Sequence, residues 1–196
     1  YVKVERSKID VVPLGLDLAG YEGVRPKSGD GTFRIGYLAR VCPEKGLHVL
    51  AEAFKLLCDR KGNEAIRLSV AGWVGKRDEH YLAGVQDQLR DWGLSDRVSF
   101  LHDFGREDKL TFLQEIDVLS VPTPYREPKG LFVLEAMASG VPVVQPDHGT
   151  YPDYIGRTGG GVLVPTPSPV DVADGIQKLM DDRELCAELS ERGAEG

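Results

Sequence analysis

Short apolar segments alternate with helical segments along most of the chain, and this alternation constrains the fold more than any other feature. Six segments have the apolar character of strands; they lie at 33–38, 67–71, 98–101, 117–121, 141–144 and 161–164. Helical segments fall between them, as at 46–58, where Leu47, Leu50 and Phe54 recur on one helical face. Strands that alternate with helices predict an α/β fold: an open, mostly parallel, Rossmann-like sheet with helices on both faces.

The composition excludes several classes of protein. The chain has 196 residues, 41% of them hydrophobic, and a net charge of −7. This length fits one domain with a short appendage, the hydrophobic content excludes a disordered chain, and the acidic balance argues against a nucleic-acid partner. No apolar run approaches the roughly 20 residues of a membrane-spanning helix. The three cysteines are far apart, without a Cys-x-x-Cys pair, and there is no basic-then-apolar leader, so we expect a cytoplasmic protein.

The N-terminal part of the chain differs from the rest. A short apolar segment at 8–17 is typical of a strand that runs into a turn, and residues 20–32 are rich in glycine, proline and charge, as linkers are. We therefore divide the chain into an interdomain strand and linker at 1–32 and a compact domain at 33–196. Both ends look cut from a longer protein.

Two cations follow the first predicted strand, at the edge of the sheet where ligands bind. Parallel strands bring their carboxyl ends to one edge, and a crevice forms there. Arg40 and Lys45 lie in this loop, next to the N-terminus of a helix, where backbone amides and the helix dipole favour anions. The alternative is a solvated Arg and Lys, with Glu44 paired to either of them.

Two glutamates follow the fourth predicted strand. Glu127 lies in the loop and Glu135 lies eight positions later, in the first turns of the next helix, beside an apolar face. A carboxylate that faces a cleft can accept hydrogen bonds from vicinal sugar hydroxyls. The alternative is a solvated loop acid and a helix acid near a positive dipole end.

Other loops offer weaker candidates, and several familiar motifs are missing. Trp73 and the segment 102–105 either flank a base or sugar or cover the core, and His148 is best interpreted as a loop histidine. The sequence has no Gly-x-Gly-x-x-Gly after the first strand, no Walker A motif and no Gly-x-Ser-x-Gly elbow. The histidines lack metal-ligand spacing, so we expect no metal and no cofactor.

Taken together, these loops resemble the C-terminal, donor-binding domain of the retaining GT-B glycosyltransferases of the group 1 (family 4) type. The segment 40–46 is similar to the family's Gly-Arg-Leu-x-x-x-Lys-Gly loop, and 127–135 is similar to its Glu-x7-Glu element. The segment 149–165 resembles its glycine-rich turn and last strand, and 9–17 resembles its linker. The second of these motifs is the most specific, and the resemblance spans nearly the whole chain.

The resemblance implies a function and a set of site residues. The family transfers a sugar from a nucleotide diphosphate sugar, such as a UDP-sugar or GDP-sugar, with retention of configuration and without a bound metal. Arg40 and Lys45 would hold the diphosphate, Glu135 the ribose hydroxyls, and Glu127 the donor sugar. Of these, Glu127, Arg40 and Lys45 would be catalytic. The remaining donor-binding positions would be the loop residues Asp103, Phe104 and Gly105 at the base, and the backbone amides near Gly130, Leu131 and Phe132 beside the sugar.

The resemblance also implies what this chain lacks, and the sequence departs from the family in places. A glycan, lipid or small-molecule acceptor would be held by an N-terminal domain that is absent here, so the fragment alone would be inactive. Ala39 replaces a glycine, and Pro128 and Lys129 replace the Gly-Phe pair that follows the first glutamate. The alternatives are a nucleotide-sugar epimerase built on the same plan, a non-catalytic nucleotide-binding domain, and a glycoside hydrolase that uses Glu127 and Glu135.

Overall fold

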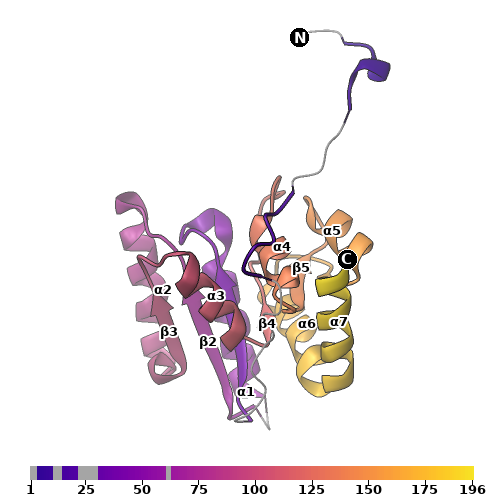
Figure 1. Ribbon diagram of the computed structural model, residues 1–196. Coiled ribbons are helices and arrows are strands. Elements are labelled where there is room, and N and C mark those ends of the chain that lie inside the picture. The colour runs from indigo at the N-terminus through magenta and orange to yellow at the C-terminus, as the bar shows by residue number, and fades with distance from the viewer. Residues whose placement is uncertain (1–3, 11–14, 22–30, 61–62) are drawn as a thin grey trace.

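The strands form one parallel sheet. The computed structural model describes residues 4–10, 15–21, 31–60 and 63–196, and Figure 1 shows its ribbon. The described strands are β1 Phe33–Leu38, β2 Ile66–Ala71, β3 Val98–Leu101, β4 Val118–Leu119, β5 Val143–Pro146 and β6 Gly161–Val164. Every pairing is parallel, in the order β3-β2-β1-β4-β5-β6. The prediction of an open, parallel, Rossmann-like sheet is therefore confirmed, and the strand order reverses between β1 and β4, where such folds bind ligands.

Helices cover both faces of this sheet, as the alternation predicts (Figure 1). The longer helices are α1 Leu47–Asp59, α2 Glu79–Asp91, α3 Arg106–Glu115, α4 Leu131–Ala138, α5 Tyr151–Thr158, α6 Pro169–Asp181 and α7 Arg183–Glu195. Contacts place α1, α2 and α6 on one face, and α4, α5 and α7 on the other. The connection from β3 back to β4 places α3 on this second face, because such crossovers are right-handed.

The bounds of β4 and β5 differ most from the prediction. β4 has two residues rather than five, and β5 begins at Val143 because Pro142 has no N–H to donate to the ladder. Ser120 nevertheless continues the direction of β4, since its N–H donates to the Gly36 carbonyl at 2.9 Å. The short ladder leaves the loop after β4 free to turn toward α1.

The N-terminal segment contributes one buried side chain to the domain. Arg6–Lys8 form the 3-10 helix η1, whose residues are exposed, and no strand forms in residues 4–10 and 15–21. The rest of the predicted interdomain strand and linker, at 11–14 and 22–30, lies outside the described residues. Tyr21 is only 1% exposed and belongs to the core, and its hydroxyl contacts Glu135 of α4, a helix on the second face of the sheet.

Gly46 lets the loop after β1 approach the end of β4. It precedes α1 with a left-handed φ of 73°, and a Cβ added there would lie 2.1 Å from the Pro122 carbonyl oxygen. Only glycine combines this backbone conformation with so close a contact. The contact brings Lys45 over the loop that follows β4.

We expect Gly46→Ala to destabilise the fold more than an alanine at an open glycine of similar φ. The matched control is Gly93→Ala, because Gly93 has a φ of 70° and a Cβ there would meet nothing within 4 Å. The control pays about 1 kcal/mol for the left-handed conformation alone, and Gly46→Ala a further 1–3 kcal/mol or so for the forced displacement. Urea unfolding of both variants measures the difference, and equal losses would show that the loops are not held in contact.

Candidate functional site

A buried ion pair joins the loop after β1 to the loop after β4. Lys45 ends the 3-10 helix η2 Pro43–Lys45, and its ammonium pairs with Glu127 Oε2; the two side chains are 11% and 5% exposed. Lys45 Nζ also lies 3.1 Å from Tyr125 Oη, and this phenol donates to Glu127 Oε2 at 2.7 Å. The Phe132 ring closes the other side, with its centroid 5.3 Å from the ammonium. Lys45 therefore pairs with Glu127 rather than with the neighbouring Glu44.

The second oxygen of Glu127 binds the start of α4. Glu127 Oε1 accepts hydrogen bonds from the backbone N–H groups of Lys129 and Gly130, each at 3.2 Å. Burial acts to raise the pKa of Glu127, but the hydrogen bonds from Lys45, Tyr125 and Gly130 outweigh it and leave the pKa below its ordinary value. The carboxylate is therefore ionised at neutral pH, with every oxygen occupied.

The loop between β5 and α5 supports this arrangement from behind. A Cβ on Gly149 would lie 2.6 Å from the backbone nitrogen of Glu127, and the N–H of Thr150 donates to the Glu127 carbonyl at 2.9 Å. The Tyr154 hydroxyl donates to the Lys129 carbonyl at 2.8 Å. The backbone of the Glu127 loop is thus held at several points, while the Lys129 side chain is exposed.

Arg40 has different surroundings from Lys45. Its side chain is exposed and lines a pocket of about 360 Å³ with Trp73, Lys76, Arg77 and two neighbouring residues. The Tyr37 hydroxyl donates to the Arg40 carbonyl at 2.9 Å and fixes the backbone there. Three cations line this pocket, and only Arg40 was predicted from the sequence, because Lys76 and Arg77 belong to no motif.

Glu135 lies one turn into α4, and two side chains donate hydrogen bonds to it. Its Oε1 accepts from Lys109 Nζ of α3 at 2.5 Å and from Tyr21 Oη at 3.2 Å. The Glu135 side chain is 16% exposed. The apolar periodicity correctly predicted that Glu135 lies beside an apolar face, but it did not predict the two partners, because they lie 26 and 114 positions away.

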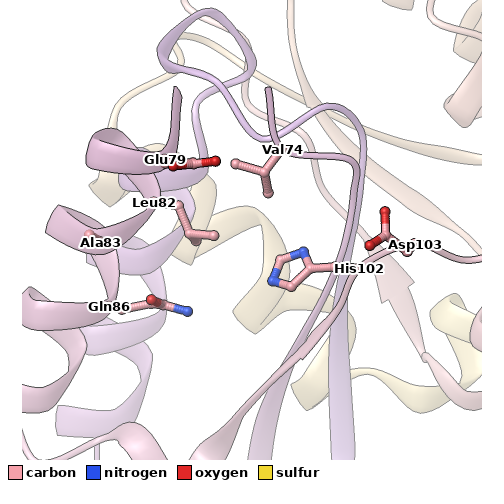
Figure 2. A pocket seen from close by; sticks show the side chains of 7 residues that line it. All are labelled: Val74, Glu79, Leu82, Ala83, Gln86, His102 and Asp103. Carbon is pink, nitrogen blue, oxygen red and sulfur yellow. The ribbon is translucent and has the colours of Figure 1, made fainter. Parts of the chain in front are cut away.

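The three residues predicted to contact the base have different surroundings. Asp103 lines a pocket of about 240 Å³ between α2 and the end of β3, together with His102, Glu79 and other side chains (Figure 2). Phe104 packs against the core, and the Gly105 N–H binds the Asp108 carboxylate at 2.9 Å, which caps α3. Asp103 has a left-handed φ of 53°, which is unusual for a residue other than glycine.

The three residues predicted beside the sugar begin α4. Gly130 precedes the helix with a φ of 56°, and its N–H is occupied by Glu127. Leu131 is 39% exposed, whereas Phe132 is buried beneath Lys45. Of the predicted site residues, the structure thus joins Lys45, Glu127 and the start of α4 directly, and it places Glu135 on the same helix.

Neither a membrane-spanning helix nor a metal-binding cluster occurs among the described residues. Among the helices described, none is long and apolar enough to cross a membrane. In the same part of the chain, no three histidine, cysteine, aspartate or glutamate side chains gather closely enough to hold a metal ion. The three cysteines are free thiols.

Comparison with known proteins assigns the family. The profile of the family described as glycosyl transferases group 1 matches residues 24–196. This chain belongs to the group 1 glycosyltransferases. The D-inositol 3-phosphate glycosyltransferase of Nocardia farcinica, for example, is 30% identical over 187 residues, which are 92% of this chain and 41% of that protein. The chain therefore spans less than half the length of this relative.

Solved glycosyltransferases of the GT-B fold have the same architecture. The C-terminal domain of a group 1 glycosyltransferase from Francisella tularensis superposes with a TM-score of 0.79 at 22% identity, over 92% of this chain and 95% of that one. The Anabaena protein HepE, in complex with UDP and glucose, has a TM-score of 0.76 at 23% identity, over 84% of this chain and 43% of that one. The domain thus has the fold of one GT-B half.

The ion pair of this glycosyltransferase domain makes its stability depend on pH. Because Glu127 has a lowered pKa in the folded state, its contribution is present above its ordinary pKa of 4.5 and is lost as the pH falls through the folded-state value. We expect Glu127→Gln to lower the free energy of unfolding by about 1.5–3 kcal/mol at pH 7. The difference from the wild type should narrow below pH 4.5.

Urea unfolding of both proteins at a series of pH values measures this difference. Glu191→Gln is the matched control, since Glu191 is exposed on α7. A difference that stayed constant from pH 7 to pH 3 would show that the ionised form of Glu127 does not stabilise the fold.

Proposed function

We propose that this chain is the donor-binding domain of a retaining, metal-independent glycosyltransferase. It would bind a nucleotide diphosphate sugar, and an N-terminal domain outside this chain would hold a glycan, lipid or small-molecule acceptor. The observation that carries the proposal is the Lys45–Glu127 pair at the start of α4, where the sheet order reverses. The family assignment, and the greater length of the relatives, support the division into two domains.

Arg40 and Lys45 supply the electrostatic part of the mechanism that we propose. When the bond between the sugar and the diphosphate breaks, negative charge builds up on the departing oxygen. Cations fixed at that point stabilise the transition state more than the ground state, and backbone amides at a helix N-terminus add to them. This is why the reaction would need no metal.

Glu127 couples the sugar to this charge balance. Lys45 is neutralised by Glu127, so a diphosphate must share or displace that carboxylate to reach the ammonium. A donor sugar whose hydroxyls bind Glu127 would offer the carboxylate new donors as Lys45 turns to the phosphates. The Lys45–Glu127 pair would therefore contact both the diphosphate and the sugar of the donor.

The base and the cellular location are part of the same proposal. The Anabaena structure contains UDP and glucose, which makes UDP-sugars the first donors to test and GDP-sugars the second. We propose a cytoplasmic location because free cysteines are typical of reducing compartments.

The donor-domain proposal predicts binding without turnover for residues 1–196. Calorimetry with UDP, GDP, ADP and their sugar conjugates, repeated in EDTA, should identify one preferred diphosphate that binds equally without metal. Transfer to a broad acceptor set should be absent, because proximity to a held acceptor supplies much of the rate. Multiple turnover by this chain alone would contradict the two-domain division, and binding that EDTA abolishes would contradict metal independence.

The anion-site proposal predicts a loss that depends on the diphosphate. Arg40→Ala should weaken UDP binding about 10- to 150-fold, since a charge-assisted contact is worth about 1.5–3 kcal/mol. Uridine binding should be unchanged. Lys55→Ala is the control, because Lys55 is a cation on α1 that pairs with Asp59. Since Lys45→Ala would leave Glu127 buried without its partner, the lysine is better tested as Lys45→Met with Glu127→Gln.

Calorimetry against UDP and uridine reads out both variants, with thermal melting to check folding. If a folded Arg40→Ala bound UDP as tightly as the wild type, Arg40 would lie outside the diphosphate site.

A further inference from the structure

The two carboxylate oxygens of Glu135 are in different states. Oε1 receives both hydrogen bonds, from Lys109 and from Tyr21. Within the parts of the chain that the structure describes, Oε2 has no hydrogen-bond partner, and it is not among the buried polar atoms that lack one. One oxygen is therefore anchored, while the other keeps its full capacity to accept hydrogen bonds.

Tyr21 and Lys109, the two donors to Glu135 Oε1, are themselves held in place and keep their protons. Tyr21 is almost fully buried, and the guanidinium of Arg106 lies 5.5 Å from the centroid of its ring while also donating to the Ala19 carbonyl. Burial raises the pKa of Tyr21, so the phenol keeps its proton and remains a donor. Burial acts to lower the pKa of Lys109, but the hydrogen bond and the charge of Glu135 leave it raised, so the ammonium keeps its charge.

We propose that Tyr21 and Lys109 are positioning residues that orient Glu135 for a ribose. By holding Oε1 they would prevent the carboxylate from exchanging its oxygens, and Oε2 alone would accept from the vicinal 2′ and 3′ hydroxyls of the nucleotide. This inference rests on the proposed function. It extends the donor site to the N-terminal segment, since Tyr21 precedes β1 by twelve positions.

The physical gain is preorganisation. A free glutamate must lose rotamer freedom when a ligand binds, and a carboxylate already held by two donors has lost it on folding. Lys109 also cancels the charge of Glu135, which would otherwise repel an anionic donor. Removing the Tyr21 hydroxyl keeps that charge balance and loosens only the orientation.

The test compares UDP with 2′,3′-dideoxy-UDP on the wild type and on Tyr21→Phe by calorimetry. We expect Tyr21→Phe to weaken UDP about two- to tenfold and to leave the dideoxy analogue unchanged. Tyr81→Phe is the matched control, because it removes a phenol that binds His48 on the opposite face of the sheet. It should change neither affinity.

A second variant covers the case in which Tyr21→Phe fails to fold. Lys109→Met is titrated by NMR with uridine and 2′,3′-dideoxyuridine. Because neither ligand is charged, the unpaired charge of Glu135 in this variant does not repel them. It should weaken uridine alone, and Lys109→Arg should restore much of the loss.

The outcomes separate this inference from the proposed function. Equal losses for both ligands, or no loss for UDP, would overturn the positioning role while diphosphate binding stood. If the wild type bound UDP and its dideoxy analogue with equal affinity, Glu135 would not bind the ribose hydroxyls, and the inference would be overturned. Failure of every nucleoside diphosphate to bind would overturn the proposed function itself.

Discussion

The buried ion pair between Lys45 and Glu127 is the interaction on which the rest of the site depends. Two charges taken out of water are tolerated only if they are paired and their remaining hydrogen-bonding capacity is used. Here Tyr125 and two backbone N–H groups complete the set around Glu127. The loops after β1, β4 and β5 pack so that these groups meet.

Close backbone contacts make that meeting possible. Gly46 brings the loop after β1 onto the Pro122 carbonyl, and Gly149 brings the loop after β5 onto the backbone of Glu127. Neither position has room for a Cβ, so the two glycines act through packing as well as through backbone freedom. The result is one packed edge of the sheet, made of three loops that follow three adjacent strands: β1, β4 and β5.

Glu127 and Glu135 differ in whether their carboxylate oxygens are available to a ligand. Both oxygens of Glu127 are occupied, and a ligand must displace a partner to reach it. Glu135 keeps one oxygen unoccupied by any described residue. Eight positions along one chain thus separate a carboxylate held in an ion pair from a carboxylate that is held at one side and open at the other.

Periodicity and local chemistry were enough to predict the architecture and the placement of single residues. Strand and helix patterns are local, so they gave six strands, the parallel sheet, and Arg40, Lys45 and Glu127 near the carboxyl ends of its strands, with Glu135 on the following helix. The order and spacing of the motifs likewise predicted the family. The short β4 was not predicted, because its length depends on pairing with β1 and with Val143 of β5, which the apolar run at 117–121 does not encode.

Partners across the fold were decided only by tertiary structure. The pairing of Lys45 with Glu127 joins residues 82 positions apart, and that of Tyr21 with Glu135 joins residues 114 positions apart. No local pattern encodes such contacts, since they depend on which strands become neighbours and how closely their loops pack. The same reason gives Arg40 and Lys45 different surroundings: Arg40 lines a pocket with Trp73, whereas Lys45 pairs with Glu127. Because β2 and β4 flank β1 on either side, two cations of one loop contact residues that follow different strands.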